Sequence, residues 1–145
     1  EISIALLARS AKNGDMGDVE VLPPSEIDYS TFPPEKPRIV GYSAKWLEDS
    51  FEYNNTNNIF DIPETDRNLL DRLRRISLKC WDIFAFEGYG RVDFRIDKSG
   101  TPFVLEVNAN TCIAPDSGLV KSAAHAGISY EDVLMRIIDN PVIPQ

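Results

Sequence analysis

The sequence predicts a mixed α/β fold, a mainly antiparallel sheet backed by one long helix. A helical period of apolar residues runs through 65–86. Two stretches of alternating side chains, 90–96 and 102–108, flank a turn that contains glycine, which is typical of a hairpin. Short helical patterns follow at 117–126 and from Ser129.

Composition limits the classes of function. The chain has 145 residues, enough for one domain with a core, and a net charge of -8, which disfavours a nucleic-acid partner. No apolar run approaches the roughly 20 residues that span a bilayer, and no export signal is visible. Cys80 and Cys112 could pair, but two free thiols in a reducing cytoplasm are the favoured interpretation.

The first half of the chain predicts a hairpin and a long loop. Residues 1–9 and 19–22 have strand character around a turn. Residues 23–58 hold five prolines and are expected to form a long ordered loop with a mobile tip at 54–58. A disordered connector is the alternative, but aromatic residues such as Trp46 favour packing on a surface.

The second half contains the helices and the second hairpin. Thr65 is a candidate N-cap of the long helix. The turn 97–100 joins the hairpin strands, Gly127 ends the first short helix, and Ser129 caps the last helix with Asp132 in a variant capping box. The apolar face of the long helix is expected to contain Leu69, Leu73, Ile76, Cys80, Ile83 and Phe84.

The hairpin at 91–108 carries the chemistry. Arg91, Asp93 and Arg95 share one face of the first strand, and Glu106 and Asn108 share one face of the second, opposite Leu105 and Val107.

If the turn places Ile96 near Phe103, Asp93 lies across from Glu106. Two adjacent carboxylates repel, so a positive charge is expected between them. With an amide oxygen they form a hard oxygen set suited to Mg²⁺ that bridges nucleotide phosphates, which Arg91 could also contact. The pattern alone leaves open a solvated strand face without a metal.

Several motifs resemble the D-alanine–D-alanine ligase branch of ATP-grasp enzymes. The motifs Gly90-Arg91-Val92-Asp93-Phe94 and Leu105-Glu106-Val107-Asn108 are similar to the closing motif of that family. The ending Ala126-Gly127-Ile128-Ser129-Tyr130 is similar to its last helix. The strand after Glu1 and the run Ala44-Lys45-Trp46-Leu47 extend the resemblance over the whole chain.

The resemblance implies that residues 1–145 form a single C-terminal ATP-grasp lobe, with the first lobe and an N-terminal domain outside this chain. In the full-length parent, ATP would activate a carboxylate as an acyl phosphate, which an amine would attack to form a C–N bond. The chain alone is expected to be inactive. ATP and Mg²⁺ (or Mn²⁺) are the implied cofactors, and a small-molecule carboxylate and amine are the implied substrates. Nucleic-acid and membrane partners are not expected, and homodimerisation through the missing parts is left open.

The same resemblance assigns roles to individual residues. Asp93, Glu106 and Asn108 would bind two magnesium ions, and Arg91 would contact the nucleotide and stabilise the transition state. In addition, Glu1 would contact the ribose, Lys45 the phosphates and Ser117 the carboxylate of the second substrate.

The loop at 109–118 departs from the family pattern. Cys112 stands near the position of a glycine that supplies a backbone N–H, and Asp116 precedes Ser117. A negative charge at Asp116 would suit an amine better than a second carboxylate, although Asp116 could instead cap the following helix. These departures leave two alternatives open: a non-catalytic nucleotide-binding or partner module, and a structural domain without a ligand.

Overall fold

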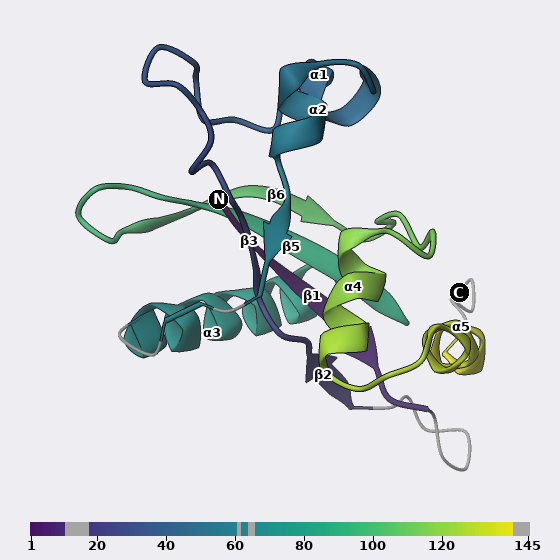
Figure 1. Cartoon of the computed structure of the whole chain (residues 1–145). Helices are drawn as coiled ribbons and strands as arrows, with labels where there is room; N and C mark the ends of the chain where they lie inside the picture. The colour runs from purple at the N-terminus through teal and green to yellow at the C-terminus, as the bar shows by residue number, and fades with distance from the viewer. Residues whose placement is uncertain (11–17, 61, 64–65, 141–145) are drawn as a thin grey trace.

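The computed structural model describes residues 1–10, 18–60, 62–63 and 66–140 (Figure 1). The predicted fold class is confirmed, because helices pack on an antiparallel six-stranded sheet. The strand order is β4-β3-β1-β5-β6, and β2 pairs with the C-terminal half of β1. The strands are β1 Ile2–Ala8, β2 Val19–Val21, β3 Ser25–Ile27, β4 Asn58–Ile59, β5 Tyr89–Ile96 and β6 Pro102–Asn108. The helices are α1 Tyr42–Trp46, α2 Phe51–Asn55, α3 Arg67–Ile83, α4 Gly118–His125 and α5 Tyr130–Asp139.

Strand β1 separates two hydrophobic cores, because alternate side chains of a strand point to opposite faces. Ile4 and Leu6 pack in the core beneath α3, whereas Ala5 and Leu7 pack in the core beneath α4 and α5. Each face of the sheet is therefore covered by different helices, as Figure 1 shows.

Helix α3 follows the predicted period but is shorter than expected. Leu73 and Cys80 are buried as predicted, and the candidate cap Thr65 lies outside the described residues. Ile83 and Phe84 are 74% and 58% exposed, so their predicted place in the core is wrong. The helix ends at Ile83, and Ala85 takes a φ of 46°, which turns the chain before Phe86 enters the core.

The β5–β6 hairpin contains a bulge that sequence alternation alone does not reveal. Ile96 pairs with Pro102 rather than Phe103, and a register shift beside Asp93 then places Asp93 opposite Glu106, as predicted. Leu105 is the extra residue of the bulge. Its predicted position on the face opposite Glu106 is wrong, because both residues line the same hollow.

Residues 28–57 form a small unit rather than a loop without secondary structure. Its core is aromatic: the Phe32 ring lies 5.0 Å from that of Tyr29 and 5.3 Å from that of Phe51, measured between centroids. Phe32 is buried, although α1 and α2 themselves contain no buried residue. In Figure 1 this unit stands apart from α3, α4 and α5.

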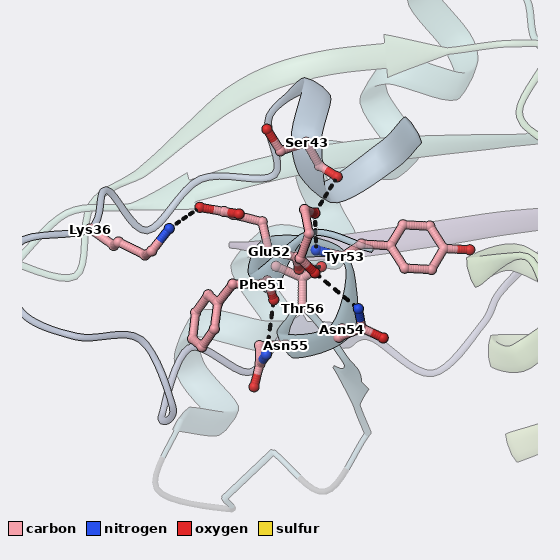
Figure 2. Close-up of polar contacts among 9 residues, drawn as sticks. Lys36, Ser43, Phe51, Glu52, Tyr53, Asn54, Asn55 and Thr56 are labelled. Atoms are coloured by element: carbon pink, nitrogen blue, oxygen red, sulfur yellow. Dashed lines mark hydrogen bonds and ion pairs between the residues drawn. The ribbon is translucent and has the colours of Figure 1, made fainter. Parts of the chain in front are cut away.

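Polar contacts hold α1 and α2 together (Figure 2). The Ser50 hydroxyl accepts from the Tyr53 N–H as the N-cap of α2 and donates to the Ser43 carbonyl of α1. Lys36 pairs with Glu52, which lowers the pKa of that carboxyl through its hydrogen bond. The expected mobility of residues 54–58 stays a prediction.

The two predicted C-terminal helices are confirmed, with Ser117 and Ser129 as their N-caps. The Ser129 hydroxyl accepts from the Asp132 N–H and donates to the Asp132 carboxylate, so the two residues bond reciprocally, although the carboxylate accepts from the hydroxyl and not from the backbone N–H of a capping box. Arg136 of α5 donates to Glu20 of β2 at 2.8 Å, so the last helix is fastened to the first hairpin. Within the described part of the chain, no helix combines the length and the apolar character needed to cross a membrane.

Candidate functional site

A polar hollow lies on the face of the sheet opposite α3. Residues from β1, β3, β5 and β6 form its floor. Residues of the small unit at 28–57 line the side that faces the sheet. The strand alternation that buries Ile4 and Val92 beneath α3 leaves Ser3, Arg91 and Asp93 on the hollow's side. Its charged lining residues are Glu1, Lys45, Arg91, Asp93 and Glu106.

Arg91 and Asp93 form the central ion pair of the hollow. The Arg91 Nε and Nη2 donate to the two carboxylate oxygens of Asp93, each at 2.8 Å. Asp93 is only 7% exposed, so this bidentate pair satisfies a buried charge. The positive charge expected near the two opposed carboxylates is thus partly supplied by the protein.

Glu106 and Asn108 continue the polar surface on β6. The Asn108 Nδ2 donates to Glu106 at 3.4 Å, and the Asn108 Oδ1 accepts from the Asn110 N–H. Asn108 is not among the residues that line the hollow, whereas Glu106 is. The structure therefore brings Asp93 and Glu106 to the hollow and leaves Asn108 beside it.

These donors fit a divalent cation by their chemistry, because opposed carboxylates supply hard oxygen ligands. Over the described residues, no three His, Cys, Asp or Glu side chains come together as a metal cluster. A cation held by Asp93 and Glu106 would thus need further oxygens from water or a ligand. Mg²⁺ characteristically binds in this way, keeping water and phosphate in its coordination shell.

Lys45 and Glu1 border the hollow from different elements. Lys45 is exposed on α1, and Glu1 precedes β1. The Arg95 Nη1 lies 3.9 Å from Glu1 and also donates to the Arg38 carbonyl. Arg95 thereby connects the sheet to the segment that leads to α1.

The predicted acceptor residues lie at the start of α4, outside the hollow. Ser117 accepts from the Val120 N–H at 3.4 Å as the N-cap, so the alternative in which Asp116 caps this helix is wrong. Asp116 is exposed, and neither it nor Ser117 lines the hollow, although Gly118 does.

Sequence reasoning missed most of the uncharged residues that line the hollow, and it missed the contacts of Arg95 beside it. Leu105 lines the hollow only because of the bulge. Arg95 connects Glu1 with the Arg38 carbonyl. The signal for Arg95 was its place on the same strand face as Arg91 and Asp93.

The chain matches a known protein family. Residues 1–139 match the family described as D-ala D-ala ligase C-terminus. The chain belongs to this family. Its D-alanine–D-alanine ligase relatives include one from Nitrosospira multiformis, 33% identical over 97 residues, which are 67% of this chain and 30% of the relative.

Two further relatives match different shares of this chain. D-alanine–D-alanine ligase A of Bacillus cereus is 31% identical over 100 residues, which are 69% of this chain and 33% of that enzyme. An uncharacterized protein of Sinorhizobium fredii is 32% identical over 144 residues, which are 96% of this chain and 37% of that protein. The chain thus spans about a third of the length of these relatives.

Solved structures of family members have the same fold. The D-alanine–D-alanine ligase of Bacillus anthracis is 26% identical with a TM-score of 0.62, and the match covers 95% of this chain and 38% of that one. A structure of the Bacillus anthracis ligase complexed with ATP gives a TM-score of 0.64 at 24% identity, covering 95% and 36%.

Proposed function

We propose that this chain is the C-terminal ATP- and Mg²⁺-binding lobe of an ATP-dependent carboxylate–amine ligase. The observation that carries the proposal is the hollow in which Arg91, Asp93, Glu106 and Lys45 meet in a chain of this family. The full-length parent would contain the domain and lobe that complete the nucleotide site. Its reaction would join a small carboxylate to an amine through an acyl phosphate.

Each charged residue has a distinct task in this proposal. Lys45 on α1 and Arg91 on the sheet would donate to phosphate oxygens, and Arg91 would also stabilise charge that develops on transfer. Asp93 orients the guanidinium of Arg91 through its two hydrogen bonds. Glu1 would accept hydrogen bonds from ribose hydroxyls.

Asp93 and Glu106 would hold magnesium, with Asn108 beside them as a further oxygen donor. When bound, Mg²⁺ would neutralise the charge of the phosphates and of the two carboxylates. Without such a cation, the carboxylates would repel the anionic nucleotide. The Mg²⁺ dependence of nucleotide binding is therefore part of the proposal.

Ser117 and Asp116 would belong to the acceptor site of the full-length parent. The exposed charge of Asp116 beside Ser117 favours an amine acceptor other than D-alanine. A substrate panel with the parent and its Asp116→Ser variant tests this. Efficient D-alanyl-D-alanine formation, unchanged by the substitution, would reject it.

A non-catalytic nucleotide-binding module is the second candidate. The observation in its favour is that the Ser117 hydroxyl accepts from the Val120 N–H to cap α4, so it is engaged within the protein. This module would bind Mg²⁺–ATP, but its full-length parent would form no C–N bond with any carboxylate and amine.

Phosphate release separates these candidates. The full-length parent should release phosphate when supplied with ATP, Mg²⁺, a carboxylate and an amine, and Asp93→Asn should abolish the release. Asp97→Asn, in the exposed hairpin turn, is the matched control and should have little effect. The 145-residue chain alone should show no turnover. Steady release by this chain, or a fully active Asp93→Asn parent, would contradict the proposal.

A further inference from the structure

Helix α3 carries a concentration of positive charge in an acidic protein. Residues 67–83 contain five Lys or Arg and two Asp, a net charge of +3, whereas the whole chain has a net charge of -8. The remainder of the chain therefore carries -11. The helix lies on the face of the sheet opposite the hollow, so this charge plays no part in the proposed nucleotide site.

Three of these cations form a row along the solvent-facing side of α3. Arg72, Arg75 and Lys79 follow each other at steps of three and four residues, which places them above one another over about 10 Å of helix. All three are exposed, away from the buried Leu73 and Cys80. We call Arg72, Arg75 and Lys79 the basic stripe.

The cations of the basic stripe have no direct partner among the described residues, although Asp71 and Asp82 lie on the same outer face. Across the described residues, none of its three members forms an ion pair or a side-chain hydrogen bond, whereas Arg74 on the neighbouring side of the helix lies 3.5 Å from Asp71. Like charges three or four residues apart destabilise a helix. Three cations at this spacing do not stabilise a helix face that only contacts water. The row therefore favours an anionic partner outside the chain.

An apolar contact lies at the end of the same row. Ile83 follows Lys79 by one further helical turn and is 74% exposed, and the neighbouring Phe84 is 58% exposed. A partner that covered both features would bury these two side chains while pairing with the three cations. Burial of exposed apolar side chains would add to the electrostatic attraction.

We propose that the outer face of α3 binds an acidic amphipathic helix of another protein. Carboxylates at steps of three and four residues on such a helix match the spacing of the basic stripe, and an apolar residue one turn further on meets Ile83 and Phe84.

A nucleic acid or an anionic bilayer fits this surface less well. Both present extended negative charge, which Asp71 and Asp82 on the outer face and the -11 of the remaining chain repel. A nucleic-acid backbone also offers no apolar contact for Ile83. A short acidic helix carries only a few negative charges, so this repulsion is smaller, and its apolar residue can contact Ile83.

The test measures binding of a defined peptide to the whole 145-residue chain by fluorescence anisotropy. The probe is a labelled, end-capped, alanine-based helical peptide with Glu at positions 3, 6 and 10 and Leu at position 14, a spacing chosen to match about three turns of helix. Its partner control has Gln at the three Glu positions. The measurement is made at about 50 mM salt, which is low enough to limit the screening of charges. We expect the acidic peptide to bind at least about tenfold more tightly than the Gln peptide.

Two variants of equal charge change locate the site. Arg72→Gln, Arg75→Gln and Lys79→Gln together should weaken binding by about tenfold or more, because they remove the charges that face the peptide. Arg74→Gln, Lys98→Gln and Lys121→Gln together remove three other exposed cations and should change binding by less than about twofold. Circular dichroism of both variants checks that they fold.

Several results would overturn the proposal. They are no binding of the acidic peptide, equal binding of the Gln peptide, and equal losses in the two triple variants. Tighter binding of duplex DNA or of phosphatidylserine vesicles through the same three residues would also overturn it, because the surface would then recognise phosphate. Mg²⁺–ATP should not compete with the peptide, so the outcome is independent of the proposed nucleotide site.

Discussion

At the scale of single residues, the Arg91 guanidinium stabilises the buried carboxylate of the site, which belongs to Asp93. Asp93 is 7% exposed and accepts two hydrogen bonds from Arg91. Removal of one partner from such a pair leaves an unpaired charge in a poorly solvated place. The Arg91–Asp93 pair thus couples the stability of the sheet to the proposed phosphate-binding role of Arg91.

Arg91→Met is expected to lower the free energy of unfolding by about 1–3 kcal/mol, because Asp93 loses its hydrogen-bonding partner. Urea denaturation followed by circular dichroism measures the change. Lys98→Met in the exposed turn is the control. Adding Asp93→Asn to Arg91→Met should recover part of the loss; full stability of the single variant would show that the pair contributes nothing.

Tyr29 gives a second prediction, through its buried hydroxyl. Burial raises the pKa of Tyr29 to about 12, and the Glu1 carboxylate adds to the rise. The neighbouring Arg95 guanidinium opposes this rise. An unfolded tyrosine has a pKa of about 10, so between about pH 10 and 12 the unfolded chain ionises first and folding loses stability.

Tyr29→Phe should therefore change stability little at pH 7, and should remove the loss attributable to this residue above about pH 10. Urea midpoints of wild type and variant at pH 9 and pH 11 measure the effect (values set on either side of about pH 10, the ordinary tyrosine pKa). The prediction would be refuted if the urea midpoint of the wild type rose relative to that of the variant between about pH 9 and about pH 11.

The sequence predicted the polar centre of the site better than its rim. Asp93 was correctly placed opposite Glu106, but the expected pairing of Ile96 with Phe103 was wrong, and it is the bulge that brings Asp93 opposite Glu106. Leu105 was misplaced because a bulge shifts alternation by one residue. Arg95 was missed as a connector because its contact with the Arg38 carbonyl spans 57 residues, a separation that periodicity does not address.

At the scale of elements, a close contact between a strand and the preceding turn fixes the site. A Cβ added to Gly90 would lie 2.3 Å from the Phe86 ring and 3.3 Å from the Asn108 carbonyl oxygen. The Phe86 ring is buried and cannot move away freely. Gly90 thus allows β5 to carry Arg91 and Asp93 past Phe86.

Gly90→Ala should destabilise the protein by about 1–3 kcal/mol, the usual cost of overpacking a core. Thermal or urea unfolding measures it. Gly118→Ala is the matched control, because a Cβ at that position meets nothing within 4 Å, and alanine favours a helix. Equal stability of the Gly90→Ala variant and wild type would mean that Phe86 yields without cost.

The longest helix was predicted well from sequence, and the two shortest helices were not. Helix α3 extends over 17 residues, enough to show its period, whereas α1 and α2 have five residues each. The short helices depend on contacts between segments, such as the pair of Lys36 with Glu52 and the bond from Ser50 to the Ser43 carbonyl. Such contacts leave no periodic signal.

At the scale of the whole molecule, the sheet separates two surfaces of opposite character. One face holds the hollow with its carboxylates, Lys45 and Arg91, and the other is covered by α3 with the basic stripe. Figure 1 shows α3 and α4 on the two sides of the sheet. Nucleotide binding and protein binding are therefore proposed on separate faces.

The most direct test of the proposed nucleotide site is a crystal structure of this chain, or of its full-length parent, with Mn²⁺ and a non-hydrolysable ATP analogue. Anomalous scattering locates the manganese. The predicted peak lies within about 2.0–2.6 Å of carboxylate oxygens of Asp93 and Glu106, the range for hard cations, with the analogue's phosphates beside Lys45 and Arg91. Manganese bound away from Asp93 and Glu106, or an analogue bound outside the hollow, would contradict the account.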